Sequence, residues 1–247
     1  MARMQPGTEP GIEKWIRYFD RPGSANTRST LECCMRRAQE LDIKTVVIAS
    51  LRGVSASLAV ELFAGSGLEI VAVTIPPGAF WIVDSLTNDL WNDIPEFRKQ
   101  KEEWEEAGLE RIRMDMDEET ESRLKDQGVR VVRGTIPFYG IGTSLTGRFK
   151  GLNFEQYFTE ALRLISGGMI VCVEAAIMAA DANVIRTDQE AVVAAGTSMG
   201  LDTALVMRPS TSLTFADPES GLEIREIIAM PREKPKYSPE GVGEEYR

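Results

Sequence analysis

Residues 45–55 read TVVIASLRGVS, and the pattern of this stretch recurs through most of the chain. Its first five residues are β-branched or small and apolar, as in a strand that is covered on both faces. Gly53 then permits a tight turn, and we expect a helix to begin near Val54. A strand, a short turn and a helix in this order are typical of a parallel sheet.

The same alternation of strands and helices is expected on both sides of this unit. Further strands are predicted at residues 14–19, 69–75, 129–136, 169–173 (MIVCV), 191–194, 203–207 and 225–230. Amphipathic helices are predicted at residues 27–41, 117–127 and 154–165, with a capping box from Ser29 to Glu32 and a helix stop at Gly128. This alternation predicts a single α/β domain over residues 1–247, with a mostly parallel sheet between two helical layers.

Three segments depart from this alternation. Residues 1–11 and 232–247 are polar and rich in Pro and Gly, so we expect them to be tails. Residues 81–119 form an insertion that holds Trp81, Trp91 and Trp104 and a charged helix at residues 98–106. Because the insertion follows a strand, it is a candidate lid or oligomer contact at the edge where open α/β sheets bind ligands. A surface insertion packed on its own aromatic side chains fits the pattern equally well.

Composition excludes several classes of function. The chain has 28 Lys and Arg against 38 Asp and Glu, a net charge of −10, which disfavours binding to nucleic acid. It has no His, so His-based catalytic triads and His-ligated metal sites are excluded, and we expect no metal site. Its three cysteines form no CxxC motif, and no stretch approaches the roughly 20 apolar residues that span a bilayer. We therefore expect a cytoplasmic protein that does not enter a membrane.

Three loops that follow predicted strands carry hydroxyl groups and small residues. In the first, the start of a helix would present amides and a positive dipole to a phosphate; a capped helix start without a ligand is the alternative. The second suits close backbone approach to a polar ligand, or is a flexible connection. The third spans residues 22–27. The candidate binding residues are Ser50, Arg52, Gly53 and Ser55 in the first loop, Gly196, Thr197, Ser198, Gly200, Asp202 and Thr203 in the second, and Asn26 and Thr27 in the third.

Two further sequence features are candidates for a chemical role. Residues 142–149 have Walker A glycine spacing, but Arg148 and Phe149 stand where Lys and Ser or Thr are needed, so a nucleoside-triphosphate site is rejected. Glu174 follows the predicted strand at residues 169–173. A half-buried carboxyl at such a place is either a base with a raised pKa or a structural acceptor of backbone hydrogen bonds.

Several phrases of the sequence resemble a known family. They are YFDRPGSANTRSTL (residues 18–31), VVIASLRGVSASLAVEL (46–62), VCVEAAIMAADANVI (171–185), VVAAGTSMGLDTALVMRP (192–209) and EIIAMPR (226–232). In this order the chain resembles the uncharacterised archaeal and bacterial proteins that are similar to the C-terminal α/β domain of pyruvate kinase. The resemblance implies a three-layer α/β/α sandwich. The chain departs from the family at residues 81–119, a segment that is longer than expected.

The resemblance also implies a ligand. In pyruvate kinase the corresponding domain holds an allosteric sugar bisphosphate on a loop that looks like residues 50–55 here, with residues 196–203 as a second contributor. The stand-alone family is associated with flavin mononucleotide (FMN), whose phosphate would suit the same loop. No kinase residues are implied, because the barrel that transfers phosphate is absent from this chain.

These observations support three expectations about function. The first is a cytoplasmic protein that binds a small phosphorylated ligand, FMN before others. The second adds turnover: without His, a flavin would supply redox chemistry and the protein would position the substrate. The third is a regulatory or scaffold protein, without catalysis or pyruvate kinase activity, that binds a sugar phosphate or nucleotide and forms homo-oligomers through the insertion.

Overall fold

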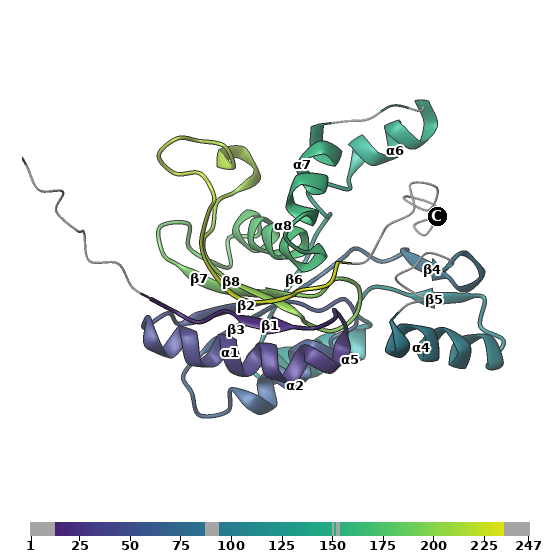
Figure 1. The fold of residues 1–247 in the computed structure, drawn as a ribbon, viewed down its shortest axis with the longest axis horizontal. Coiled ribbons are helices and arrows are strands. Elements are labelled where there is room, and N and C mark those ends of the chain that lie inside the picture. Colours follow the sequence, from purple (N-terminus) through teal and green to yellow (C-terminus); the bar gives the residue numbers. More distant parts are fainter. Residues whose placement is uncertain (1–12, 87–93, 150, 152–153, 235–247) are drawn as a thin grey trace, which may run out of the picture.

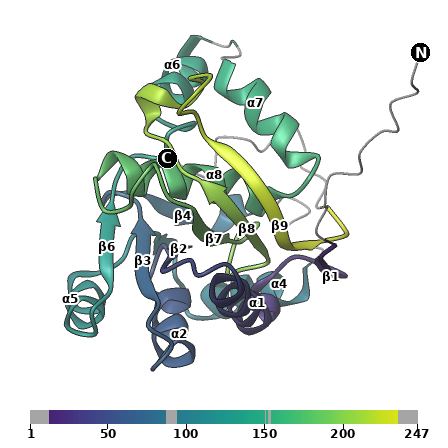
Figure 2. The ribbon, with the colours of Figure 1, turned by 90° about the vertical axis from the view of Figure 1, so that its left-hand side faces the viewer.

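The computed structural model describes residues 13–86, 94–149, 151 and 154–234. A seven-stranded sheet in the order β1-β9-β8-β7-β2-β3-β6 crosses the molecule (Figures 1 and 2). Its strands are β1 (Arg17–Phe19), β2 (Thr45–Ala49), β3 (Glu69–Thr74), β6 (Arg130–Arg133), β7 (Ala191–Ala195), β8 (Thr203–Arg208) and β9 (Glu223–Pro231). Neighbouring strands are parallel except that β8 runs antiparallel to β7 and β9. The mostly parallel α/β sheet expected from the sequence is confirmed.

Helices cover both faces of the sheet. Figure 1 shows α1, α2 and α5 on one face and α8 on the other, with α6 and α7 beyond α8. The helices are α1 (Thr27–Glu40), α2 (Val54–Leu62), α4 (Pro95–Glu106), α5 (Glu118–Asp126), α6 (Ile141–Phe149), α7 (Phe154–Arg163) and α8 (Gly167–Asp181), with short 3₁₀ turns η1 (Ser24–Asn26), η2 (Val83–Ser85) and η3 (Ser212–Thr214). The predicted helices at residues 27–41, 117–127 and 154–165 correspond to α1, α5 and α7.

The central strand β2 divides the apolar core into two layers. Val46 and Ile48 pack into the cluster beneath α1 and α2, whereas Val47 between them packs into the cluster beneath α8. Successive side chains of a strand point to opposite faces, so a continuous apolar run indicates burial on both sides. The TVVIA run thus occupies the position that its composition predicts.

The predicted strand at residues 169–173 is wrong. These residues lie inside α8, which begins where the Ser166 hydroxyl accepts a hydrogen bond from the Met169 amide at 2.9 Å. Thirteen of the fifteen residues of α8 are buried. A helix that is buried on all sides has no amphipathic period, and a short apolar window of it cannot be distinguished from a buried strand.

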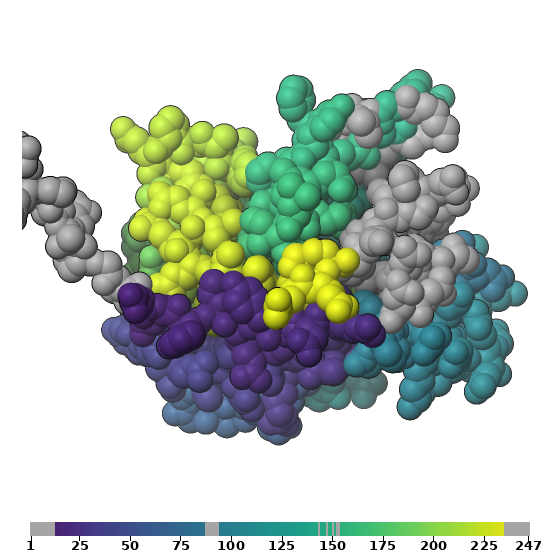
Figure 3. Space-filling view, viewed as in Figure 1, coloured from purple at the N-terminus to yellow at the C-terminus, as the bar shows by residue number. Residues whose placement is uncertain are grey.

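Two smaller predictions differ from the structure. Helix α1 begins at Thr27 as predicted, but Ser29 therefore lies within the helix and the predicted capping box is wrong. The C-terminal tail predicted from residue 232 begins later, because the amides of Arg232 and Glu233 donate to the carbonyls of Phe19 and Asp20. Figure 3 shows this C-terminal segment, in yellow, lying against the purple N-terminal segment. The rest of the predicted tails, residues 1–11 and 235–247, lies outside the described residues.

The insertion folds as a small unit at one end of the sheet. Its strands β4 (Phe80–Ile82) and β5 (Arg111–Arg113) pair in antiparallel fashion, and α4 packs beside them (Figure 1). The expected solvated helix at residues 98–106 is the larger part of α4, but it buries Trp104. Trp81 and Trp104 stack with ring centroids 5.9 Å apart. The described aromatic side chains of the insertion thus pack on one another and against Ile75 at the end of the sheet. Trp91 lies outside the described residues.

Candidate functional site

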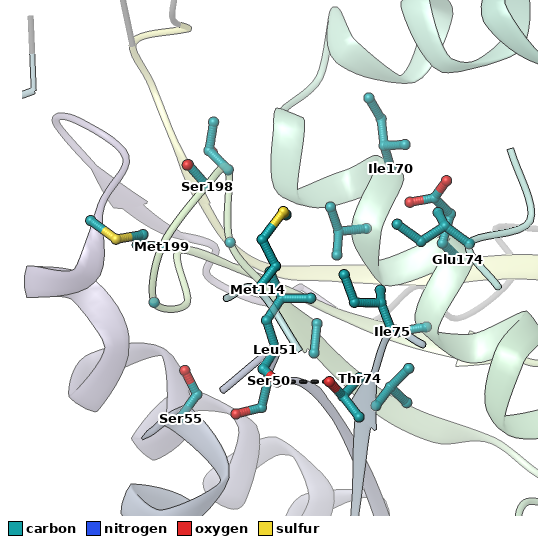
Figure 4. Close-up of a pocket in the computed structure, with 18 of the residues that line it drawn as sticks. Ser50, Leu51, Ser55, Thr74, Ile75, Met114, Ile170, Glu174, Ser198 and Met199 are labelled. Carbon is teal, nitrogen blue, oxygen red and sulfur yellow. Dashed lines mark hydrogen bonds between the residues drawn. The ribbon is translucent and has the colours of Figure 1, made fainter. Parts of the chain in front are cut away.

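A cavity of about 250 Å³ lies at the carboxyl ends of β2, β3 and β7. Strand β2 is paired with β3 on one side and with β7, from much later in the chain, on the other. Open α/β sheets bind ligands at such a point, where connections diverge from neighbouring strands. Helix α8 forms one wall with Ile170 and Glu174, and the insertion adds Met114 (Figure 4). Trp81 of the insertion also lines the cavity. The cavity is therefore lined both by the ends of the sheet strands and by the insertion at residues 81–119.

The loop between β2 and α2 forms one end of the cavity. Ser50 Oγ accepts a hydrogen bond from the Ala56 amide at 3.2 Å, so it caps the first turn of α2. Gly53 has a φ of +86°, and a Cβ there would overlap Thr120 of α5. Thr74 Oγ1 donates to the Leu51 carbonyl at 2.7 Å and so ties the loop to the end of β3. This loop is held by contacts on several sides and presents a helix N-terminus.

Arg52 lines the cavity beside the insertion. Its guanidinium carbon lies 5.7 Å from the Trp81 ring centroid and 5.9 Å from that of Trp104. Burial lowers the pKa of Arg52, but an arginine stays protonated at neutral pH. No carboxylate of the described residues forms an ion pair with Arg52. The aromatic rings therefore orient a cation whose hydrogen-bonding groups can serve an anion.

The loop after β7 also lines the cavity, with Gly196, Thr197, Ser198, Met199 and Gly200. A Cβ at Gly196 would overlap the Gly200 carbonyl, so the loop needs glycine to close on itself. The side chain of Thr197, which lines the cavity, also interacts with the buried carboxyl of Asp202 and helps to lower the pKa of that group.

Asp202, a candidate binding residue, joins three segments behind the cavity. Its fully buried carboxyl accepts hydrogen bonds from the amides of Gly23 at 3.3 Å and Thr197 at 3.0 Å and from Thr203 Oγ1 at 2.8 Å. Burial raises the pKa of Asp202, against the effect of these donors. Thr203 Oγ1 in turn lies 2.9 Å from Ser166 Oγ at the start of α8. The network fixes the loop after β7 in place.

The third candidate loop supports the second. Thr27 Oγ1 donates to the Ser24 carbonyl at 2.7 Å and accepts from the Leu201 amide at 3.0 Å. Asn26 Nδ2 donates to the Arg21 carbonyl at 2.7 Å. The structure therefore places seven of the twelve candidate residues on the cavity wall, namely Ser50, Arg52, Ser55, Gly196, Thr197, Ser198 and Gly200. The other five, Asn26, Thr27, Gly53, Asp202 and Thr203, form the supports of these loops.

Sequence reasoning missed the remaining wall of the cavity. Trp81, Tyr139 and Arg163 come from the insertion, from the loop after β6 and from α7, and none belongs to a recognisable motif. Glu174 was singled out, but as the end of a strand; it lies in α8 and is 4% exposed. Glu174 reaches the same cavity as the loops at residues 50–55 and 196–200 because of the path of α8 across the sheet. Local sequence does not encode that path.

Other sequence features lie away from the cavity. Residues 142–149 are part of α6, so their glycine spacing belongs to a helix. Cys33, Cys34 and Cys172 are buried, and burial raises the pKa values of Cys34 and Cys172. Across the described ranges, no three acidic or Cys side chains are arranged to hold a metal ion. None of the helices in those ranges combines the length and apolar character needed to cross a bilayer.

The comparison with protein families adds no assignment, because no family model matches this chain.

Proposed function

We propose that this chain binds a small phosphorylated ligand in the cavity at the carboxyl ends of β2, β3 and β7, and that FMN is the first ligand to test. The observation that carries this proposal is the convergence of two loops on one cavity. The N-terminus of α2 with Ser50 and Ser55 meets the Gly196 to Gly200 loop there. The first loop was predicted from sequence to bind phosphate and the second to approach a polar ligand, and some 140 residues separate them in the chain.

The cavity has groups suited to each part of such a ligand. The α2 amides, the serine hydroxyls and Arg52 would hold a phosphate dianion, and their local positive potential offsets the overall charge of −10. Leu51, Ile75, Met114 and Ile170 form apolar walls suited to a ring system. These groups fit FMN, and the apolar walls favour it over a sugar phosphate. When bound, a flavin supplies hydride and electron transfer.

The proposal also includes the cellular location and the fold family of the protein. We infer a cytoplasmic binding protein whose fold is that of the pyruvate kinase C-terminal domain. The second inference rests on the resemblance of the sequence phrases, and the mostly parallel α/β sheet is consistent with it. We propose binding, and turnover by a bound flavin stays a separate expectation that reduction of FMN with NADH or NADPH would test. The regulatory alternative predicts that a sugar phosphate or nucleotide binds while FMN does not.

The test begins with the visible absorption of protein purified without added cofactor. Titrations with FMN and with riboflavin, which lacks the phosphate, then separate the two halves of the ligand. We expect Arg52→Ala to weaken FMN binding by about 10- to 100-fold, the effect of losing a charged hydrogen bond, and riboflavin binding by much less. Arg148→Ala, on the exposed surface of α6, is the matched control and leaves both affinities unchanged.

The proposal fails if no phosphorylated compound stabilises the protein. FMN, inorganic phosphate, sugar phosphates and nucleotides would each be tested by thermal denaturation, since a ligand that binds only the folded state raises Tm. A rise with sugar phosphates or nucleotides alone would reject FMN and favour the regulatory alternative.

A further inference from the structure

Glu174 is a buried carboxyl on the wall of the same cavity. It lies in α8, is 4% exposed, and receives no hydrogen bond at Oε1 from any described residue. Figure 4 places Glu174 with Ile170 and Ile75 on one side of the cavity, apart from Ser50, Ser55 and Ser198 on the other. The cavity therefore has two polar ends with apolar side chains between them.

The surroundings of Glu174 keep it neutral. Burial raises the pKa of Glu174 to about 8, while the backbone amide of Phe138 and the charge of Arg163 on α7 oppose this rise. The other titratable or charged side chains among the described residues of the cavity wall are Tyr139 and Arg52. At pH 7 the carboxyl is therefore mostly protonated, with one hydrogen-bond donor and a remaining acceptor.

A buried carboxyl oxygen without a hydrogen bond destabilises the fold, so the position of Glu174 Oε1 calls for an explanation. Glu174 Oε1 has no hydrogen-bond partner among the described residues, and Glu174 lines this cavity. A molecule that occupies the cavity would supply that partner. Ile170 and Met178, four residues before and after Glu174 on α8, also line the cavity and make that end apolar, which disfavours a strongly hydrated ion.

We propose that Glu174 recognises the end of the ligand remote from the phosphate, by a hydrogen bond between its Oε1 and a neutral N–H or C=O group of a heterocyclic ring. This assignment deepens the proposed function and rests on it for the phosphate end. The ligand class is then a phosphorylated heterocycle with an imide- or lactam-like edge. A protonated carboxyl pairs well with such an edge because each partner both donates and accepts.

The experiment compares four proteins in FMN titrations between pH 7 and pH 9. They are the wild type, Glu174→Gln, Glu174→Leu and the control Glu61→Gln, whose exposed carboxylate on α2 pairs only with Arg28 among the described residues. At pH 7 we expect Gln, a neutral donor and acceptor, to stay within about threefold of wild type, and Leu to lose about tenfold or more. A purely structural role for Glu174 would not give this split.

The pH profile is the second readout. Because the neutral form of Glu174 binds, wild-type affinity falls as pH rises through about 8, whereas the affinity of Glu174→Gln stays constant over the same range. Glu61→Gln follows the wild type. If Glu174→Leu does not fold, which circular dichroism would show, the contrast between wild type and Glu174→Gln still decides the question.

The outcomes separate this inference from the proposed function. If FMN binds and its affinity is the same in all four proteins at every pH, Glu174 has no role in recognition, and the phosphate site stands. If inorganic phosphate and Arg52→Ala leave the protein unaffected but riboflavin binds wild type and not Glu174→Leu, the Glu174 inference holds and the phosphate site is rejected. If neither FMN nor riboflavin binds, both are overturned.

Discussion

Arg52 lies over the ring of Trp81, with 5.7 Å between the guanidinium carbon and the ring centroid, and both side chains line the cavity. The pair joins a loop selected from sequence to an insertion whose role the sequence left open. Trp81 is 5% exposed, so the cation and the ring meet largely away from water. Desolvation strengthens such an attraction, and several measurable consequences follow from this arrangement.

A double-mutant cycle measures this attraction. We expect Arg52→Gln, Trp81→Leu and the double variant to give a coupling energy of about 1 kcal/mol in urea denaturation. The control is the Arg148 and Phe149 pair, at 5.4 Å, in which both side chains are exposed. Its coupling should be about 0.5 kcal/mol or less. Equal coupling in the two pairs would show that the insertion does not strengthen the Arg52 contact.

Gly53→Ala tests the packing of the α2 loop. Gly53 and Gly65 both have positive φ, +86° and +76°, but only a Cβ at Gly53 would meet a neighbour, Thr120 of α5. Gly65→Ala should therefore cost only backbone strain, about 1 kcal/mol. Gly53→Ala should cost clearly more and should also weaken FMN binding, because the loop must shift away from α5. Similar losses in unfolding free energy for both would refute a close contact.

Asp202 provides a contrast between two substitutions. Asn can keep one oxygen toward the Gly23 and Thr197 amides and offer its amino group to Thr203, whose hydroxyl also accepts. Asp202→Asn should therefore change the unfolding free energy by less than about 1 kcal/mol. Asp202→Ala leaves buried amides unpaired and should cost about 3 kcal/mol. A large loss with Asn would mean that the negative charge itself holds the loop.

Arg133 and Asp115 give a prediction on pH. The Asp115 side chain is fully buried and is bound by Arg113 at 2.6 Å and Arg133 at 2.9 Å. Mainly because of the Arg113 hydrogen bond, the pKa of Asp115 is lowered, so its contribution to stability exists above about pH 4 and is lost as pH falls below. Arg133→Met should cost about 3 kcal/mol at pH 7 and less at pH 3.

The control for this prediction is Arg186→Met. Arg186 pairs with Asp188, and both side chains are about two-thirds exposed. Exposed pairs contribute little, so this variant should change the unfolding free energy by less than about 1 kcal/mol at either pH. Urea denaturation at the two pH values measures all of these differences. A gap for Arg133→Met that does not narrow at pH 3 would contradict the role given to Asp115.

Local sequence predicted the elements of the fold that can be recognised from their own residues, without knowledge of what they pack against. The TVVIA strand, the start of α2 at Val54 and the end of α5 before Gly128 follow from β-branched runs, a turn glycine and a helix stop. The strand predicted at residues 169–173 failed because α8 is apolar on every side, which removes the period that marks a helix.

The candidate site was also predicted only in part. Loops that follow parallel strands gather at one edge of a sheet, so Ser50, Arg52, Ser55 and residues of the Gly196 loop could be foreseen there. Trp81 and Arg163 reach the cavity only through tertiary packing. Asp202 looked like a ligand-binding carboxylate, but three hydrogen bonds behind the cavity occupy it, and no local motif distinguishes these two roles.

The burial of α8 also bears on the kinetics of opening. Helix α8 has no solvent-exposed face, and it packs against β7, β8 and β2. It is therefore not expected to unfold separately from the sheet. We therefore expect the amide hydrogens in the middle of α8 to exchange with solvent deuterium only when the whole domain unfolds. Exchange measured at those amides would then report global stability, and the wall that carries Glu174 would be among the slowest parts of the molecule to open.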